Sequence, residues 1–264
     1  MDVVEENPEQ NTHGARVATR VPWTIGDIAK AIAVVIAATV VVAFGLGLGT
    51  ILLVGPATLV GSGLTDISGL LDLLAAEGML QPWLLLMMTA MLVGEAAMPL
   101  SAWLFGALKY RCGWRALGFR SFRAFDGVTL AAIVVLVGLL VSFLYDMLFS
   151  HLGLDPPSNL PAGLAETGLG LGIVVVLAVV VAPVAEETFF RGFILAGIGR
   201  RLGNAWAVVL SALLFSVAHM QPGALLPIFI LGLLLGWLYV RTRSIWPCIL
   251  THFAYNSIAV LFML

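Results

Sequence analysis

Long uncharged stretches alternate along this chain with short polar segments, and the uncharged stretches predict membrane-spanning helices. A helix needs about 20 apolar residues to cross the hydrocarbon core of a bilayer, and seven stretches have about that length. Turn residues at Gln221, Pro222 and Gly223 divide one longer uncharged run into two of them. The predicted spans are residues 28–54, 82–108, 127–145, 167–186, 202–219, 224–241 and 244–264.

The segment between the first two predicted spans has a different pattern. Residues 61–81 carry Asp66, Asp72 and Glu77 among several leucines. Acidic and apolar residues mixed in this way are typical of a helix that lies in the membrane interface. We therefore expect a short interfacial helix here and do not count it as a span.

Between the predicted spans, lysine and arginine occur only in alternate connections. Cytoplasmic loops of membrane proteins are enriched in these residues, so the basic connections predict a cytoplasmic N-terminus and an outer C-terminus. The outer segments 61–81, 151–166 and 220–223 hold no base. The bases of the predicted inner segments are Arg16, Arg20, Lys109, Arg111, Arg115, Arg120, Arg123, Arg200, Arg201, Arg241 and Arg243.

Composition excludes a water-soluble fold and nucleic acid as a partner. Hydrophobic residues make up 61% of the 264 residues and charged residues 11%, whereas a soluble domain has about 25% charged residues. The formal charge of −2 offers no basic surface for a polyanion, so the lipid bilayer is the expected partner. We predict an all-α, polytopic transmembrane bundle with a polar tail (1–27), N-terminal helices (28–166) and C-terminal helices that carry the chemistry (167–264).

An acidic motif, Glu-Glu-Thr-Phe-Phe-Arg, follows the fourth uncharged stretch. Ionisable residues within a span are costly, so each is a candidate for function. On a helix Glu187 and Arg191 are four residues apart and face one another, whereas Glu186 points about 100° away from Glu187. Glu187 and Arg191 are therefore expected to form a buried ion pair, which leaves Glu186 free to act.

Two further polar groups occur in the last spans. Phe215 and His219 end the fifth span, and His252 and Asn256 share one face of the seventh. A glutamate can act as a general base toward water, while histidine and asparagine can donate hydrogen bonds to a developing oxyanion. Glutamate and histidine can instead hold a metal ion that acidifies water. Both chemistries are hydrolytic.

At these residues the chain resembles the CAAX protease and bacteriocin-processing (CPBP) membrane peptidases, also called the type II CAAX prenyl endopeptidase family. That family is marked by Glu-Glu-x-x-x-Arg, Phe-x-x-x-His and His-x-x-x-Asn in three successive motifs. All three occur here in order, within about residues 167–264. The first 165 residues match only as apolar spans.

The resemblance implies an intramembrane endopeptidase. It implies that Glu186 and His219 activate water, that His252 and Asn256 stabilise the oxyanion, and that Glu187, Arg191 and Phe215 support the site. Its substrates would be membrane proteins or peptides, including lipidated ones. The alternative is a non-enzymatic membrane protein, such as a transporter, immunity or scaffold subunit, that retains the fold.

The requirement for a metal stays open on the residues alone. Glu186, His219 and His252 would supply the three ligands of a catalytic zinc ion. We favour a metal-free site, because binding all three to a metal would leave only Glu187, already paired with Arg191, as a base.

Two features of the sequence fit the predicted site less directly. Glu95 stands alone in the second span, and we expect it to have a hydrogen-bonded structural role. At 1.5 Å per residue His219 lies about 27 Å from Arg201, whereas His252 lies about 13 Å from Arg243. Tilted or broken helices are needed to bring these two histidines to the same depth.

Overall fold

The computed structural model describes residues 21–61, 67–153 and 168–263, and all regular elements in these ranges are helices. The predicted polar tail lies mostly outside them. The elements are α1 (Ile25–Val54), α2 (Pro56–Gly61), α3 (Ile67–Ala76), α4 (Leu80–Ala102), η1 (Trp103–Leu108), η2 (Trp114–Leu117), α5 (Ala124–His151), α6 (Gly168–Val174), η3 (Val175–Val181), α7 (Ala182–Glu186), η4 (Glu187–Leu195), α8 (Ala196–Ala218), η5 (Pro222–Ala224), α9 (Leu225–Thr242) and α10 (Trp246–Met263).

The predicted transmembrane bundle is confirmed, and each predicted span corresponds to a helical segment. Within the described ranges, five helices are long and apolar enough to cross a membrane, and α10 is a shorter apolar helix. The longest of the five, Leu171–Ala218, has 48 residues and is interrupted at Gly203, whose φ of 78° is not helical. This interruption separates the fourth predicted span from the fifth. The expected short helix between the first two spans is α3.

One predicted boundary is wrong. The fourth span was expected to end at Glu186, but the helical chain continues through η4 into α8 before it breaks at Gly203. The first charge after a long apolar stretch does not end the helix in this case. Here both glutamates and Arg191 are buried inside the bundle, so their charges do not mark its surface.

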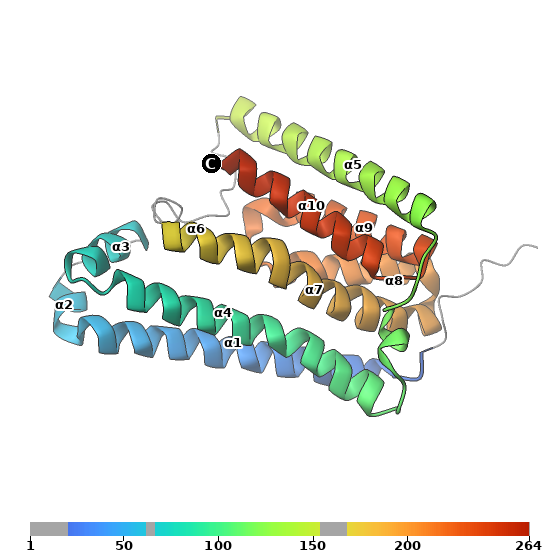
Figure 1. Cartoon of the computed structure of the whole chain (residues 1–264), viewed down its shortest axis with the longest axis horizontal. Helices are drawn as coiled ribbons and strands as arrows, with labels where there is room; N and C mark the ends of the chain where they lie inside the picture. Colours follow the sequence, from blue (N-terminus) through green and yellow to red (C-terminus); the bar gives the residue numbers. More distant parts are fainter. Residues whose placement is uncertain (1–20, 62–66, 154–167, 264) are drawn as a thin grey trace, which may run out of the picture.

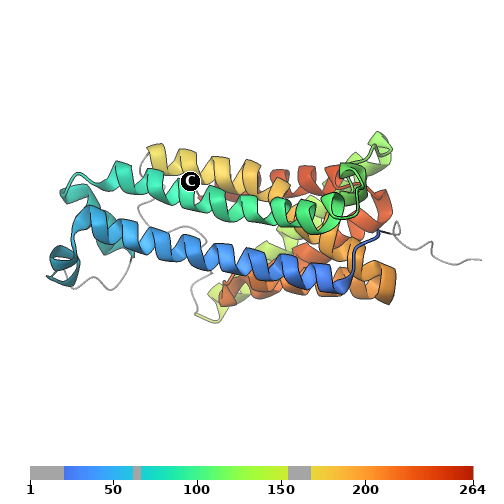
Figure 2. The ribbon, with the colours of Figure 1, turned by 90° about the horizontal axis from the view of Figure 1, so that it is seen from below.

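The helices form a bundle in which α1 and α4 lie side by side, and α6 and α7 lie between α4 and α10 (Figure 1). Helix α5 packs against α9 and α10 on the other side of the molecule. Seen from below, α1 and α4 run along most of the length of the molecule, whereas α8 and α9 gather toward one end (Figure 2).

Burial increases from the N-terminal helices toward the C-terminal ones. In the most apolar part of α1 only 6% of the residues are buried, and Phe44 and Leu52 are more than 70% exposed. In the most apolar part of Leu171–Ala218 the buried share is 53%. Since apolar side chains on α1 face outward, lipid would cover them, and the packed interior is built by the segment that carries the acidic motif.

The basic segments share one end of the bundle, where α1 begins, α4 and η1 end, α5 begins and α9 leads into α10 (Figure 1). Asp27, which is 2% exposed, joins two of these segments by accepting hydrogen bonds from Lys109 and, at 2.7 Å, from the Tyr110 hydroxyl. The hydrogen bond to Asp27 raises the pKa of Lys109. This grouping agrees with the alternation of basic connections along the chain. That this end of the bundle faces the cytoplasm stays a prediction.

Candidate active site

The acidic motif lies on a wide helical turn. Glu187–Leu195 forms a π-helix, η4, and all nine of its residues are buried. Short π-helical stretches inside α-helices occur frequently at functional sites. A Cβ atom at Gly192 would lie 2.3 Å from the backbone oxygen of Leu117, so the absence of a side chain allows η4 to approach η2 closely. The ring of the next residue, Phe193, packs against the Trp23 ring.

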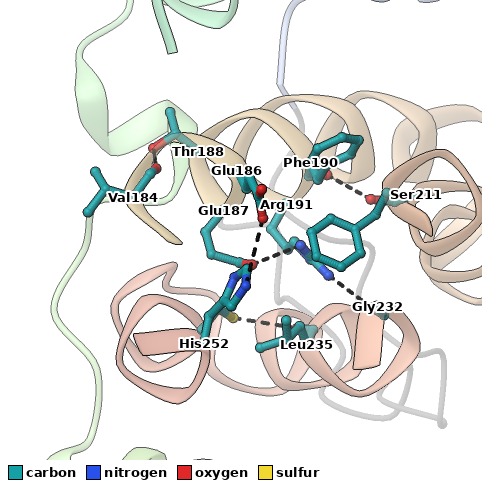
Figure 3. A network of polar contacts seen from close by, with 12 residues as sticks. Val184, Glu186, Glu187, Thr188, Phe190, Arg191, Ser211, Gly232, Leu235 and His252 are labelled. Atoms are coloured by element: carbon teal, nitrogen blue, oxygen red, sulfur yellow. Dashed lines mark hydrogen bonds and ion pairs between the residues drawn. The ribbon is translucent and has the colours of Figure 1, made fainter. Parts of the chain in front are cut away.

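Glu187 is the centre of the polar network in Figure 3. Its Oε1 atom accepts a hydrogen bond from Arg191 Nη1 at 2.8 Å and lies 3.0 Å from His252 Nδ1. Arg191 also donates to the backbone oxygen of Gly232 at 3.3 Å, and its guanidinium carbon lies 4.3 Å from the centre of the Phe215 ring. Glu187 and Arg191 have no exposed surface. The expected ion pair therefore exists, and it joins η4, α9 and α10.

Glu186 is buried and has a carboxylate oxygen available. Its Oε2 atom lies 3.7 Å from His252 Nε2, beyond hydrogen-bond distance, and has no hydrogen-bond partner in the described structure. Because an ionised carboxylate only accepts, the His252 Nδ1 proton points to Glu187, and Nε2 is turned toward Glu186. The two atoms therefore face each other without a direct hydrogen bond.

Phe215 contacts both histidines. Its ring centre lies 4.6 Å from that of His219 and 5.9 Å from that of His252. His219 Nδ1 lies 2.8 Å from the Phe215 backbone oxygen, four residues earlier in the chain. Phe215 is thus the residue that connects His219 with the network around His252.

Asn256 lies on the same helix as His252, as expected, but its amide is engaged elsewhere. Its Nδ2 atom donates to the backbone oxygen of Ala178 in η3 at 2.7 Å. Glu186, Glu187, Arg191, Phe215 and His252 therefore form one contact network, with His219 beside it and Asn256 held against a neighbouring helix.

The break at Gly203 divides the chain between the acidic motif and His219. Glu187 precedes Gly203 by 16 residues and His219 follows it by 16, so the two residues lie on different arms of a chain that folds back at Gly203. The Ser211 hydroxyl donates to the Phe190 backbone oxygen at 2.8 Å, which shows that the two arms lie against each other. The expected need for a broken helix is met here.

Sequence reasoning missed the environment of Glu95. It was expected to form structural hydrogen bonds, yet its Oε2 atom is buried with no hydrogen-bond partner among the described residues. Helix α4 packs against α7 and η4, which brings Glu95 within electrostatic range of Glu186. An isolated acid in an apolar span was the available signal, but no motif connected it to Glu186. Thr251 Oγ1, next to His252, is also buried without a partner.

The arrangement does not fit a metal held by the three predicted ligands. Glu186 Oε2 lies 3.7 Å from His252 Nε2, whereas His219 packs against the Phe215 ring. Across the described ranges, no group of three or more His, Cys, Asp or Glu side chains is placed to hold a metal ion. We therefore derive no chemical step through a metal.

Comparison with known proteins connects this network to a family. Residues 168–258 match the family described as "Type II CAAX prenyl endopeptidase Rce1-like". The chain is also similar to "Putative membrane peptidase YdiL" of Bacillus subtilis (strain 168), with 27% identity over 92 residues. That match covers 35% of this chain and 38% of the relative. No solved structure matches the chain.

The matched residues begin at α6 and continue into α10, so they contain both glutamates, Arg191, both histidines and Asn256. Helices α1, α4 and α5 lie outside the match. The C-terminal part of this membrane protein, residues 168–258, is therefore similar to the Rce1-like type II CAAX prenyl endopeptidases.

Proposed function

We propose that the protein is an intramembrane endopeptidase in which Glu186 activates a water molecule. The observation that carries the proposal is the buried Glu186 Oε2 atom, which has no hydrogen-bond partner in the described structure and faces His252 Nε2 across 3.7 Å. A buried polar atom without a partner needs an explanation, and a bound reactant is one. The family match supports a peptidase over other hydrolases.

Charge balance supports a proton-transfer role. Glu186, Glu187, Arg191 and His252 share one buried cluster, and a buried cluster is most stable when its charges cancel. They cancel when both glutamates are ionised and His252 is protonated, or when Glu186 holds the proton and His252 is neutral. One proton can therefore move between Glu186 and His252 without creating net charge, which is what general acid–base catalysis requires.

The proposed reaction has two proton transfers. Glu186, assisted by His219 as the family resemblance suggests, takes a proton from water as the water oxygen attacks the carbonyl carbon of the scissile peptide bond. The carbon–nitrogen bond then breaks, and the same proton passes to the departing amine. The products are a carboxylic acid and an amine, and no further reactant is needed.

In this proposal, His252 is the first hydrogen-bond donor to the oxyanion. In its protonated form His252 donates from Nε2, while Glu187 holds Nδ1 at 3.0 Å. Asn256 would join as a second donor after its amide leaves the Ala178 oxygen, as the family resemblance suggests. Glu187 and Arg191 act as positioning residues, because they hold the imidazole and the helices around it.

The proposed substrates are membrane proteins or membrane-associated peptides, including lipidated ones. The network is buried within helices that are suited to a bilayer, so a peptide reaches it from the membrane or its interface. The competing proposal is a non-enzymatic membrane subunit that keeps the fold. It is weaker because the chain retains every motif residue and an available carboxylate oxygen.

The test compares membrane-protein fragments in cells that express the wild type, Glu186→Gln or Glu77→Gln. Glu186→Gln keeps the size of the side chain but removes the base, whereas Glu77 is exposed and serves as the matched control. We expect specific fragments in wild-type and Glu77→Gln cells and a loss of several powers of ten in their production with Glu186→Gln, at equal protein level. Equal fragment production by Glu186→Gln would exclude this mechanism.

A further inference from the structure

An open cavity lies at the basic end of the bundle, between the first turns of α5 and the last turn of α9. Its volume is about 410 Å³. Arg123, Asp126 and Thr129 line one side, and Arg241 and Thr242 line the other. Two guanidinium groups and one carboxylate give the lining one surplus positive charge. The composition of this cavity, which shares no residue with the candidate active site, favours an anion.

Among the described residues, neither arginine is hydrogen-bonded to a carboxylate. The Arg123 side chain is 91% exposed, and its Nη1 atom lies 3.7 Å from Asp126 Oδ2, too far for a hydrogen bond. Arg241 is exposed, and its guanidinium carbon lies 5.5 Å from the centre of the Trp237 ring. Over residues 21–61, 67–153 and 168–263 it forms no ion pair. Both guanidinium groups can therefore turn toward a ligand in the cavity.

Aromatic side chains place this cavity at the level of the membrane interface. Trp237 and Trp246, which precede and follow Arg241, are 38% and 44% exposed, and Trp114 at the same end is 50% exposed. Tryptophan is enriched where lipid headgroups meet the hydrocarbon core. Exposed tryptophans next to exposed arginines are therefore expected at headgroup depth.

An apolar surface continues from the cavity along α5. Phe125, which lines the cavity, is 83% exposed, and Leu136 and Phe143 farther along α5 are 67% and 64% exposed. A ligand with a charged head and long apolar chains would contact the arginines and this surface together. A free anion would use only the arginines.

We propose that this cavity binds the phosphate of an anionic phospholipid headgroup, with the acyl chains lying along α5. Basic pockets between transmembrane helices at one membrane face bind such headgroups in general. Arg123 and Arg241 supply the charge, and the Thr129 hydroxyl is an additional donor. Asp126 opposes the ligand, so its neutralisation strengthens binding.

The test measures phosphatidylglycerol and phosphatidylcholine bound to the purified full-length protein by native mass spectrometry. We expect a preference for phosphatidylglycerol that falls about fivefold for each of Arg123→Gln and Arg241→Gln. Asp126→Asn should raise it, and Thr129→Glu, which keeps both arginines, should lower it. The control Arg115→Gln/Arg201→Gln removes two exposed bases from the same end but outside the cavity.

Three outcomes would overturn the proposal. The wild type could bind both lipids equally, which would show that charge does not select the ligand. The control pair could lose as much binding as the cavity variants, which would assign the effect to diffuse surface charge. Excess inorganic phosphate could displace the lipid completely, which would identify the ligand as a small anion. Size-exclusion profiles of each variant establish that a lost preference does not come from unfolding.

Discussion

His252 Nδ1 lies 3.0 Å from Glu187 Oε1, and the same oxygen accepts a hydrogen bond from Arg191 at 2.8 Å. One carboxylate oxygen thus orients an imidazole on α10 and neutralises a guanidinium on its own helix. All three side chains are at most 3% exposed. Because η4 and α10 are held together through this oxygen, the stability of the fold and the orientation of His252 depend on the same pair.

Arg191→Ala is expected to lower the free energy of unfolding by about 3–5 kcal/mol, because it leaves Glu187 buried without its partner. Glu187→Gln/Arg191→Met should cost less than Arg191→Ala, since neither charge then remains unpaired. Folded yield and unfolding in detergent measure both effects. If Glu187→Gln and Arg191→Met had strictly additive effects, the pair would not be coupled in the way described.

Gly192→Ala is expected to destabilise the fold by about 1–3 kcal/mol or more, because the added Cβ would meet the Leu117 backbone oxygen at 2.3 Å. Gly45→Ala is the matched control, as a Cβ there meets nothing within 4 Å. Thermal unfolding of the two variants should differ clearly. Equal stability would show that η2 can move away from η4 without cost.

The metal-free mechanism predicts full activity after removal of metal. Metal content is measured by elemental analysis of the purified protein, and cleavage is measured before and after a membrane-permeant chelator. Stoichiometric zinc whose loss abolishes cleavage, and whose return restores it, would contradict the proposal. It would also mean that Glu186, His219 and His252 come closer together than the described structure places them.

The orientation predicted from basic residues is tested with reporter fusions. Fusions at Arg115 and Arg201 should report the cytoplasm, and a fusion at Gln221 should report the opposite side. Fusions at Pro157 and Leu264, which lie outside the described residues, are also predicted to report the outer side. A cytoplasmic C-terminus would remove one crossing from the predicted topology.

Much of the fold follows from local signals in the chain. Uncharged stretches of sufficient length predict spans, because a bilayer rejects charge whatever the tertiary contacts are. The same reasoning failed at Glu186, because buried charges that pair with each other do not end a helix. Gly203 alone does not identify a helix break in the sequence, because other glycines in this chain, such as Gly45, lie within continuous helix.

The site was predictable where one helix sets the spacing. Glu187 and Arg191 were placed correctly by their separation of four residues. Contacts between helices were not predictable in this way, because they depend on packing angle and depth. Two such contacts between helices are the approach of Glu95 to Glu186 and the hydrogen bond from Asn256 to the Ala178 oxygen.

The wide turn of η4 also restricts how the chain can change over time. A π-helix closes its hydrogen bonds over five residues, so deletion of one residue converts the turn to α-helical geometry. The segments on either side would keep nearly the same rotation, because the wide turn holds one residue more than the α-helical turn that replaces it. A deletion between Glu187 and Arg191 would nevertheless shorten their separation from four residues to three and move the two side chains relative to each other. Deletions between these two residues should therefore be absent from active relatives of this protein.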